Sequence, residues 1–270
     1  ISGTGPEGRV VHADLDRELT RGRSSAASTT LSDASDDRHE IAIRGVRRRI
    51  AERLSEAWRE IPHITYVNDV DVTELERLRS ELNAGSGDRS ARLTILPFLA
   101  RAIVLAVAEQ PGLNAHYDHA SEILTTFDAA HIGIATQTDD GLRVPVVRHA
   151  EGRGVWDLAD EITRVTSAAR DGSATRDELT GSTITITSLG ALGGVATTPI
   201  INPPEVAIVG VNKMETRPVW QDGSFRPRQV LNLSSSFDHR MVDGWDAATF
   251  VQRIKRLLET PALLFVSTGV

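Results

Sequence analysis

The chain has 270 residues, of which 40% are hydrophobic, and its formal net charge is −7 at neutral pH. This length allows one large domain with an appendage or two modest domains, and the negative charge argues against nucleic-acid binding. Cysteine is absent, which excludes disulfides, thiolate metal sites and cysteine nucleophiles. No apolar run approaches the roughly 20 residues of a membrane-spanning helix, and no signal peptide opens the chain. We expect a fragment of a longer polypeptide, located in the cytoplasm of a bacterium or in the mitochondrial matrix of a eukaryote, with the cytoplasm favoured.

Composition divides the chain into three parts. Residues 1–19 predict a glycine-rich loop followed by a short helix. Residues 20–40 are rich in Ser, Thr, Ala, Asp and Arg, with Leu31 the only large aliphatic residue, and predict a flexible linker. From Ile41 onward, periodic apolar patterns continue to the C-terminus and predict one domain, residues 41–270.

Apolar periodicity within this domain predicts alternating helices and strands. The expected helices contain Val46 to Trp58, a capping-box pattern at 73–76 followed by Leu78 and Leu82, the apolar run 95–108, the segment 155–169, and the segment 247–258. The expected strands are 132–137 and 142–147, joined as a hairpin, then 183–188, 206–211 and 230–237. This order predicts the α/β class (α+β), with a mixed, mainly antiparallel sheet.

The segment Phe237–Gly244 contains the residues best suited to chemistry. A strand is expected to end near Phe237 and a helix to begin near Asp243, so His239 lies in the connection. Imidazole is the side chain best matched to proton transfer near neutral pH. Asp243 is close enough to orient the histidine or its loop, and it is also a natural helix N-cap. An isolated histidine is more often an ordinary loop residue, but the surrounding pattern favours a functional role here.

Asp238–Gly244 resembles the D-H-R-x-x-D-G signature of the 2-oxo-acid dehydrogenase acyltransferases, and chloramphenicol acetyltransferase carries a related H-x-x-x-D-G pattern. The resemblance extends in family order from about Arg44 to Leu264. The matching segments are I-P-H-I-T at 61–65, D-V-D-V-T at 69–73, N-A at 114–115, I-G-I-A at 132–135, G-L-R-V-P-V at 141–146, G-S-T-I-T-I-T at 181–187 and N-P-P-E at 202–205. It implies the chloramphenicol-acetyltransferase-like fold, a two-layer sandwich of helices on a mixed sheet.

This resemblance implies an acyltransferase that moves an acyl group between dihydrolipoamide and coenzyme A. His239 would be the general base on the coenzyme A thiol, and such a base contributes about 10²–10⁴-fold in rate. Thr187 would donate a hydrogen bond to the oxyanion of the tetrahedral intermediate, and Asp243 would support the histidine loop. A strand threonine is more often an ordinary β-branched residue. Because side chains alternate along a strand, only one of Thr187 and Ser188 can face the site.

Charged residues near these positions receive supporting roles. Asp238 and Arg240 are interpreted as a structural ion pair that holds the histidine loop. Arg47 and Arg48 belong to a basic run that resembles the family's basic helix start near coenzyme A, whose phosphates guanidinium groups suit. A solvated helix face is an equally good interpretation of each arginine. No metal site is expected, because the H-x-x-H pattern at 116–119 has no third ligand and is better interpreted as two solvated loop histidines.

The opening G-T-G-P-E-G-R-V, residues 3–10, resembles the latter half of a peripheral subunit-binding domain, which docks partner enzymes. Residues 1–19 would be a remnant too short for a stable core, and we expect it to be poorly ordered. Its G-x-G-x-x-G pattern lacks the preceding strand of a dinucleotide site. The lipoyl group must come from a lipoyl domain outside this chain, because neither Lys213 nor Lys255 lies in a D-K-A setting.

The resemblance also implies an assembly. Homotrimers are expected, with His239 of one subunit meeting Thr187 of the next, and a cubic 24-mer or larger cage is expected in many members. The partners would be the 2-oxo-acid decarboxylase and dihydrolipoamide dehydrogenase, with no nucleic acid and no membrane. The segments 61–66 and 73–75 favour a branched-chain or pyruvate-type acyl group over succinyl, without deciding it. Two alternatives remain: a non-catalytic scaffold of the same complex, disfavoured by the retained catalytic residues, and a small-molecule acetyltransferase of the same fold, disfavoured by the N-terminal segments.

Overall fold

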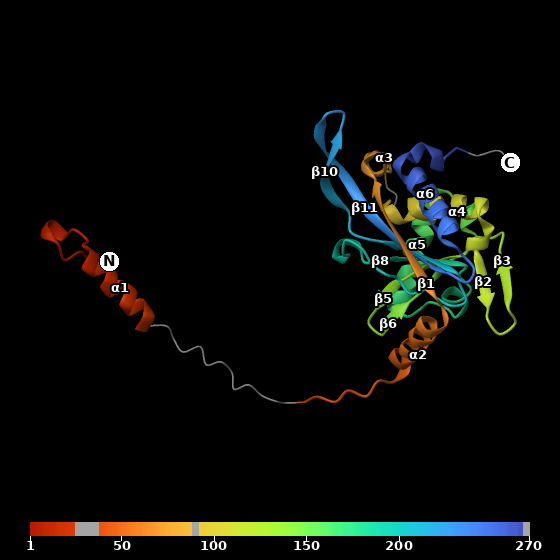
Figure 1. Ribbon diagram of the computed structural model, residues 1–270, viewed down its shortest axis with the longest axis horizontal. Coiled ribbons are helices and arrows are strands. Elements are labelled where there is room, and N and C mark those ends of the chain that lie inside the picture. Colours follow the sequence, from red (N-terminus) through yellow and green to blue (C-terminus); the bar gives the residue numbers. More distant parts are fainter. Residues whose placement is uncertain (25–37, 88–91, 267–270) are drawn as a thin grey trace. The chain divides into compact units, whose positions relative to one another are not determined.

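The computed structural model describes residues 1–24, 38–87 and 92–266, and its contacts divide the chain into two units, Ile1–Ile43 and Arg44–Val270 (Figure 1). Most of the predicted linker, residues 25–37, lies outside the described residues. No helix in the described ranges is both long enough and apolar enough to span a membrane.

The first unit contains a short hydrogen-bonded segment, and none of its described residues belongs to an apolar core cluster. A 3₁₀ turn at Pro6–Gly8 precedes α1, His12–Ser24. The Asp14 carboxylate accepts hydrogen bonds from the Thr4 amide and hydroxyl at 2.8 and 2.7 Å, which closes the glycine-rich loop onto the helix. Helix α1 extends to Ser24, so the first five residues of the predicted linker, 20–24, are helical.

The helices of the second unit agree with the expected positions. They are α2 Gly45–Glu60, α3 Thr73–Ala84, α4 Ile95–Glu109, α5 Val155–Asp171 and α6 Gly244–Glu259. The predicted capping box at the start of α3 is wrong. Val72 is the N-cap there, and the Thr73 hydroxyl instead donates to the Asp71 carboxylate at 2.6 Å.

The strands form one seven-stranded sheet and two small hairpins within the described residues. They are β1 His63–Asp71, β2 Ala115–Asp118, β3 Ile123–Thr126, β4 Ile132–Ile134, β5 Thr136–Thr138, β6 Gly141–Arg143, β7 Val146–Val147, β8 Ile184–Ser188, β9 Ala207–Val211, β10 Glu215–Gln221 and β11 Ser224–Asp238. The main sheet has the order β1-β11-β9-β8-β4-β7, with β10 paired to β11. Only the pairs β4–β8 and β8–β9 are parallel, so the predicted mixed, mainly antiparallel sheet is confirmed.

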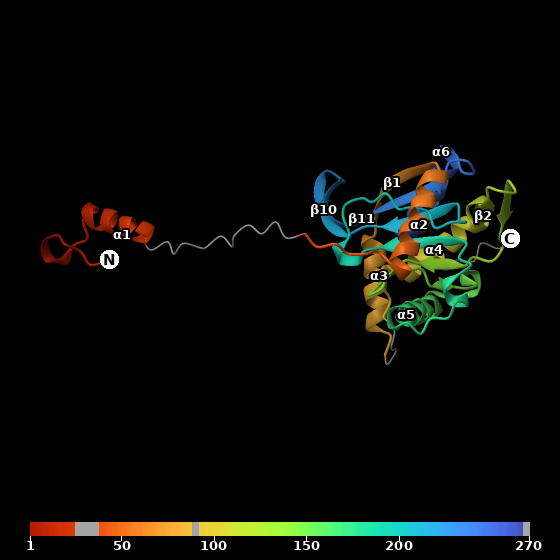
Figure 2. The same ribbon diagram turned by 90° about the horizontal axis from the view of Figure 1, so that it is seen from below.

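The two faces of the sheet have different coverings. On one face, Ile184 and Ile186 of β8 belong to a large apolar core that includes residues of α4, α5 and α6. On the other face, Thr185 and Thr187 of β8 line a cavity that is also lined by α2. Figure 2 shows α2 running across the sheet in this unit. Side-chain alternation along β8 therefore separates the apolar core from the cavity.

Candidate active site

His239 lies in the short connection from β11 to α6. Its backbone amide donates to the Pro62 carbonyl at 3.0 Å, beside the first residue of β1. Its ring nitrogen Nδ1 lies 3.0 Å from the carbonyl oxygen of Val242. Because a carbonyl oxygen only accepts, Nδ1 is the protonated nitrogen of the neutral ring, and Nε2 keeps a free lone pair. The side chain is exposed, so Nε2 is accessible to a substrate.

A buried ion pair fixes the base of this loop. Asp238 is 1% exposed. Its carboxylate accepts hydrogen bonds from Nε of Arg240 at 2.9 Å and from Nη2 of the same side chain at 2.6 Å. The hydrogen bonds to Asp238 raise the pKa of Arg240. The same guanidinium lies over the ring of Tyr117, 4.8 Å from its centre. The ion pair interpreted from the sequence is therefore present, and it connects the histidine loop to β2.

Asp243 caps helix α6 and makes no hydrogen bond to the histidine ring. Its carboxylate accepts from the amides of Trp245 and Asp246 at 2.8 and 2.9 Å. These amides belong to the first helical turn, where donors lack partners within the helix. Of the two compatible roles, the N-cap is the one formed here. Val242, and not Asp243, contacts Nδ1 of His239.

Thr187 lies on the cavity side of β8, next to Gly210 of β9 in the register. None of the residues that the structure describes forms a hydrogen bond with its hydroxyl, which is free to donate to a ligand. The neighbouring Ser188 also borders the cavity. Its hydroxyl, however, accepts a hydrogen bond from the Gly190 amide at 3.2 Å and so belongs to the turn that follows the strand.

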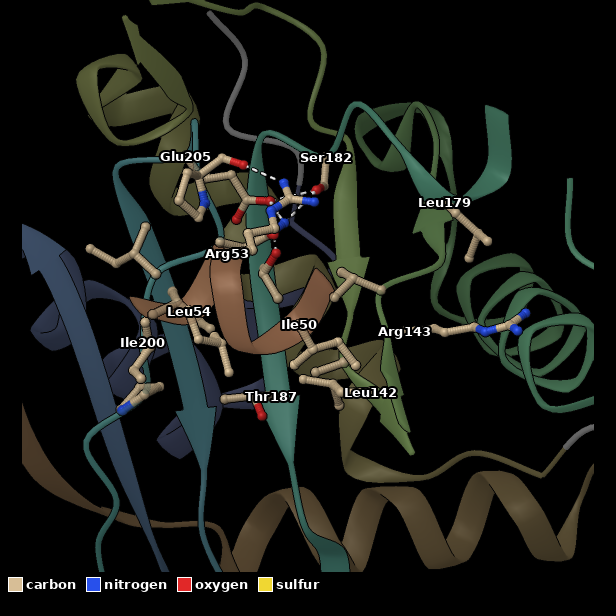
Figure 3. A pocket seen from close by; sticks show the side chains of 18 of the residues that line it. Ile50, Arg53, Leu54, Leu142, Arg143, Leu179, Ser182, Thr187, Ile200 and Glu205 are labelled. Atoms are coloured by element: carbon tan, nitrogen blue, oxygen red, sulfur yellow. Dashed lines mark hydrogen bonds between the residues drawn. The ribbon is translucent and has the colours of Figure 1, made fainter. Parts of the chain in front are cut away.

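The cavity has a volume of about 960 Å³ and is largely apolar. Figure 3 shows Arg53, Ser182 and Glu205 gathered in one region of it, Thr187 in another, and aliphatic side chains between them. These aliphatic side chains include Ile50, Leu54, Leu142 and Ile200.

Three arginines line this cavity, Arg49, Arg53 and Arg143, and neither Arg47 nor Arg48 is among them. Arg48 instead pairs with Glu52 at 2.8 Å on the exposed side of α2. Helical periodicity explains the difference, because positions 49 and 53 lie beside the apolar stripe that faces the cavity.

Glu205 is a polar group of the cavity to which the sequence analysis gave no role. Its side chain is 2% exposed within the N-P-P-E turn. Burial raises the pKa of this carboxyl to about 7. Its Oε1 accepts hydrogen bonds from the hydroxyls of Ser182 and Thr185 and from the Asn202 amide, the last two at 2.8 Å. The one available signal was an acidic residue two positions before the apolar strand β9.

His239 and Thr187 are far apart within one chain. Thr187 pairs with Gly210, and Gly210 pairs with Ser234 of β11. His239 lies five residues beyond Ser234 and two strands away from β8. Strand geometry therefore separates the two residues by roughly 20 Å. His239 does not line the cavity, so a single subunit does not bring the two predicted catalytic groups together.

One histidine of the H-x-x-H pattern has a structural role in this fold. His116 lies on β2 and is half-buried, with Nε2 2.7 Å from the Ser182 carbonyl. The prediction of a solvated loop histidine is therefore wrong for His116, whereas His119 is exposed. Over the described ranges, no group of three His, Cys, Asp or Glu residues is placed to hold a metal ion.

The fold is that of the chloramphenicol acetyltransferase class. The structure of chloramphenicol acetyltransferase superposes with a TM-score of 0.50 at 14% identity, covering 82% of this chain and 99% of that one. The family model described as 2-oxoacid dehydrogenases acyltransferase (catalytic domain) matches residues 35–266. This chain belongs to that family, which confirms the resemblance found in the sequence.

Individual relatives of the chain agree with this family assignment. The chain is 52% identical over 267 residues to the lipoamide acyltransferase component of the branched-chain alpha-keto acid dehydrogenase complex of Pseudomonas putida, covering 98% of this chain and 63% of that protein. It is 34% identical over 287 residues to the dihydrolipoyllysine-residue acetyltransferase component of the pyruvate dehydrogenase complex of Staphylococcus aureus (strain MRSA252), covering 98% and 66%. The chain thus spans about two thirds of the length of the curated relatives it matches.

Solved structures give the same result for the fold. The dihydrolipoamide acetyltransferase of Azotobacter vinelandii superposes with a TM-score of 0.82 at 36% identity, covering 85% of this chain and 95% of that one. A truncated catalytic core of the 2-oxoacid dehydrogenase multienzyme complex from Thermoplasma acidophilum superposes with a TM-score of 0.76 at 34% identity, covering 83% and 99%.

Proposed function

We propose that this domain transfers an acyl group between dihydrolipoamide and coenzyme A within a 2-oxo-acid dehydrogenase complex. The observation that carries the proposal is the hydrogen bond between Nδ1 of His239 and the Val242 carbonyl. It leaves Nε2 exposed and unprotonated in the neutral ring, which is the state a general base requires.

The transfer needs this base because a free thiol is only a few per cent thiolate at neutral pH. Nε2 of His239 takes the proton from the coenzyme A thiol as the sulfur attacks the carbonyl carbon of the S-acyl dihydrolipoyl group. The carbonyl oxygen becomes an oxyanion. When the tetrahedral intermediate collapses, the carbon–sulfur bond to the lipoyl group breaks, and the departing sulfur receives the proton from the imidazolium. The products are acyl-coenzyme A and dihydrolipoamide, with no net gain or loss of protons.

Thr187 is the proposed donor to the oxyanion, since its hydroxyl has no partner among the described residues. The study of the Azotobacter vinelandii enzyme concerns the role of a serine, a histidine and an asparagine in its catalytic mechanism, with the serine 52 positions before the histidine and the asparagine four after it. Thr187, His239 and Asp243 have the same spacings, which supports their assignment. Removing one oxyanion donor costs about 10²–10³ in kcat.

The active site is proposed to form between subunits of a homotrimer. The separation of roughly 20 Å between His239 and Thr187 within one chain supports this arrangement, because the two groups can act on one substrate only if neighbouring subunits supply them. One structural neighbour is the cubic core of the pyruvate dehydrogenase multienzyme complex, with a TM-score of 0.82 at 36% identity. This supports further assembly of the trimers into a cubic 24-mer or larger cage.

The favoured acyl group is a branched-chain one. The relative that is 52% identical is named for the branched-chain complex, whereas the relative from the pyruvate complex is 34% identical. The apolar walls of the cavity, Ile50 and Leu54 among them, suit an aliphatic acyl group. Arg49 and Arg53, which line the cavity, replace Arg47 and Arg48 as the candidate partners of the coenzyme A phosphates.

The roles of the flanking segments and the identity of the partner proteins are inferred from the family. Residues 1–19 are proposed to be part of a peripheral subunit-binding domain, residues 20–40 a linker, and residues 41–270 the catalytic domain. A lipoyl domain outside this chain would deliver the dihydrolipoyl arm, and the decarboxylase and dihydrolipoamide dehydrogenase would be the partner enzymes. The named relatives are bacterial, which supports a cytoplasmic location.

The test is a transfer assay with acetyl-, isobutyryl-, isovaleryl- and succinyl-coenzyme A as donors and dihydrolipoamide as acceptor. We expect transfer with the branched donors, and a loss of about 10²–10⁴-fold in His239→Ala and about 10²–10³-fold in Thr187→Val. A folded oligomer that transfers none of the four groups would contradict the proposal. A preference for acetyl or succinyl would contradict only the branched-chain assignment.

A further inference from the structure

The carboxyl of Glu205 joins three segments of the domain. It stands at the end of the N-P-P-E turn and receives hydrogen bonds from Asn202 in the same turn and from Ser182 and Thr185. Ser182 precedes β8, and Thr185 lies within it. The Pro203 carbonyl, in the same turn, accepts a hydrogen bond from Nη2 of Arg53 at 2.6 Å. The turn thus contacts both the sheet and α2, which covers this part of the cavity.

Thr185 and Thr187 lie on the same face of β8, one pleat apart. A displacement of β8 at Thr185 therefore moves the Thr187 hydroxyl with it. Space at Thr185 is also tight, because a Cβ added at Gly133 of β4 would lie only 2.7 Å from the Thr185 hydroxyl oxygen. The contacts to Glu205 and Gly133 leave the strand little freedom at this point.

Hydrogen bonding to Glu205 is uneven. Oε1 accepts all three hydrogen bonds, whereas Oε2 is buried without a partner among the described residues. A buried carboxyl with an unpaired oxygen is costly to keep in a fold. Charged and titratable groups around it are Arg53 of α2, whose charge acts on Glu205, and His116 of β2, which forms a β-bridge with it. Neither supplies a hydrogen bond to Oε2 that would explain the burial.

We propose that Glu205 is a positioning residue for the Thr187 hydroxyl, acting through Thr185 to set the place at which β8 presents its oxyanion donor. The inference rests on the proposed function of Thr187. It assigns Glu205 no contact with substrate. Its role is to hold a donor in place, and misplacement by about 1 Å can cost about 10²-fold in rate.

A matched pair of variants on β8 and its approach tests the proposal. Thr185→Val removes one hydrogen bond to Glu205 and keeps the side-chain shape. Thr183→Val is the control, because Thr183 is equally buried, at 1% exposed, but bonds Asn114 instead of Glu205 and does not line the cavity. We expect kcat to fall about 10-fold in Thr185→Val with KM within about twofold, and kcat to stay within about twofold in Thr183→Val although that variant also loses stability.

A double-mutant cycle with Thr187 separates positioning from a general structural effect. In the Thr187→Val background there is no hydroxyl to position, so adding Thr185→Val should change kcat by less than about twofold. Glu205→Gln keeps Oε1 as an acceptor and should retain more activity than Glu205→Leu, in which all three donors lose their partner.

The outcomes distinguish the inference from the function on which it rests. Equal kcat losses in Thr185→Val and Thr183→Val, or a full further 10-fold loss on adding Thr185→Val to Thr187→Val, would overturn the positioning role while the acyltransferase proposal stood. If Thr187→Val itself kept wild-type activity, the oxyanion assignment would fall first, and Glu205 would have no donor to position.

Discussion

The Nδ1 atom of His239 lies 3.0 Å from the carbonyl oxygen of Val242, three residues along the same loop. This contact selects the ring tautomer through the main chain, so no acidic side chain is needed to orient the base. The hydrogen bonds of the Met241 and Val242 amides to the Asp238 carbonyl, each 2.9 Å, keep the loop in this shape.

The first prediction concerns the base itself. His239→Ala should lower kcat by about 10²–10⁴-fold with little change in thermal stability, since the side chain is exposed and makes one hydrogen bond. Steady-state kinetics and a thermal melt of the oligomer measure both quantities. A variant that is folded and within about tenfold of wild-type kcat would show that another group takes the thiol proton.

The second prediction concerns Asp243 as a helix cap. Asp243→Ala should destabilise the domain by about 1 kcal/mol, because the amides of Trp245 and Asp246 lose their acceptor. Asp243→Asn should match wild type within a few tenths of a kcal/mol and retain most activity, since asparagine caps equally well. Urea unfolding and kcat measurements check this. A large activity loss in Asp243→Asn at full stability would mean that the negative charge acts on His239.

The third prediction concerns the ion pair below the histidine. Arg240→Leu leaves the buried Asp238 carboxylate without its guanidinium and should cost about 2–4 kcal/mol of unfolding free energy. Adding Asp238→Asn to this variant should restore part of the loss, because the unpaired charge is removed. Urea unfolding of the two single variants and the double variant gives the coupling. Strict additivity would show that the pair contributes nothing beyond its separate side chains.

Regular periodicity made most of the fold predictable. The apolar stripe of Val46, Ile50 and Leu54 predicted α2, and the continuous apolar run before Glu109 predicted the buried α4. Strand β1 was missed because it pairs with one neighbour only and mixes apolar residues with polar ones such as Asn68. Strand β10 was missed because most of its side chains are exposed. Neither strand has the apolar pattern that a buried strand shows.

The candidate site was predictable where its residues act locally. His239 and Asp243 lie in one short motif, and its loop contacts involve near neighbours in sequence. Helix phase turns Arg49 and Arg53 of α2 toward the cavity and not the predicted Arg47 and Arg48, and the contacts of all four with coenzyme A stay predictions. Glu205 could not be assigned, because its burial depends on donors about 20 residues earlier in the chain, namely Ser182 and Thr185.

The fourth prediction concerns pH and Glu205. Burial raises its pKa from 4.5 to about 7, so the folded state holds this proton over a pH range in which the unfolded chain releases it. The stabilisation is fully present below pH 4.5 and is lost as the pH rises to 7, and it amounts to about 3 kcal/mol. Urea unfolding at fixed subunit concentration should show wild type losing this amount relative to Glu205→Gln between pH 4.5 and 7.5. Parallel curves for the two proteins would contradict it.

The fifth prediction tests whether neighbouring subunits share each site. His239→Ala and Thr187→Val should each be nearly inactive alone. In a trimer assembled at random from equal amounts of both, about a quarter of the interfaces join an intact His239 to an intact Thr187. Co-expression with two different tags and tandem purification isolates mixed trimers, which should therefore recover a substantial fraction of wild-type activity. Mixed trimers that stay as inactive as their parents would contradict a shared site, because a site within one chain always carries one of the two lesions.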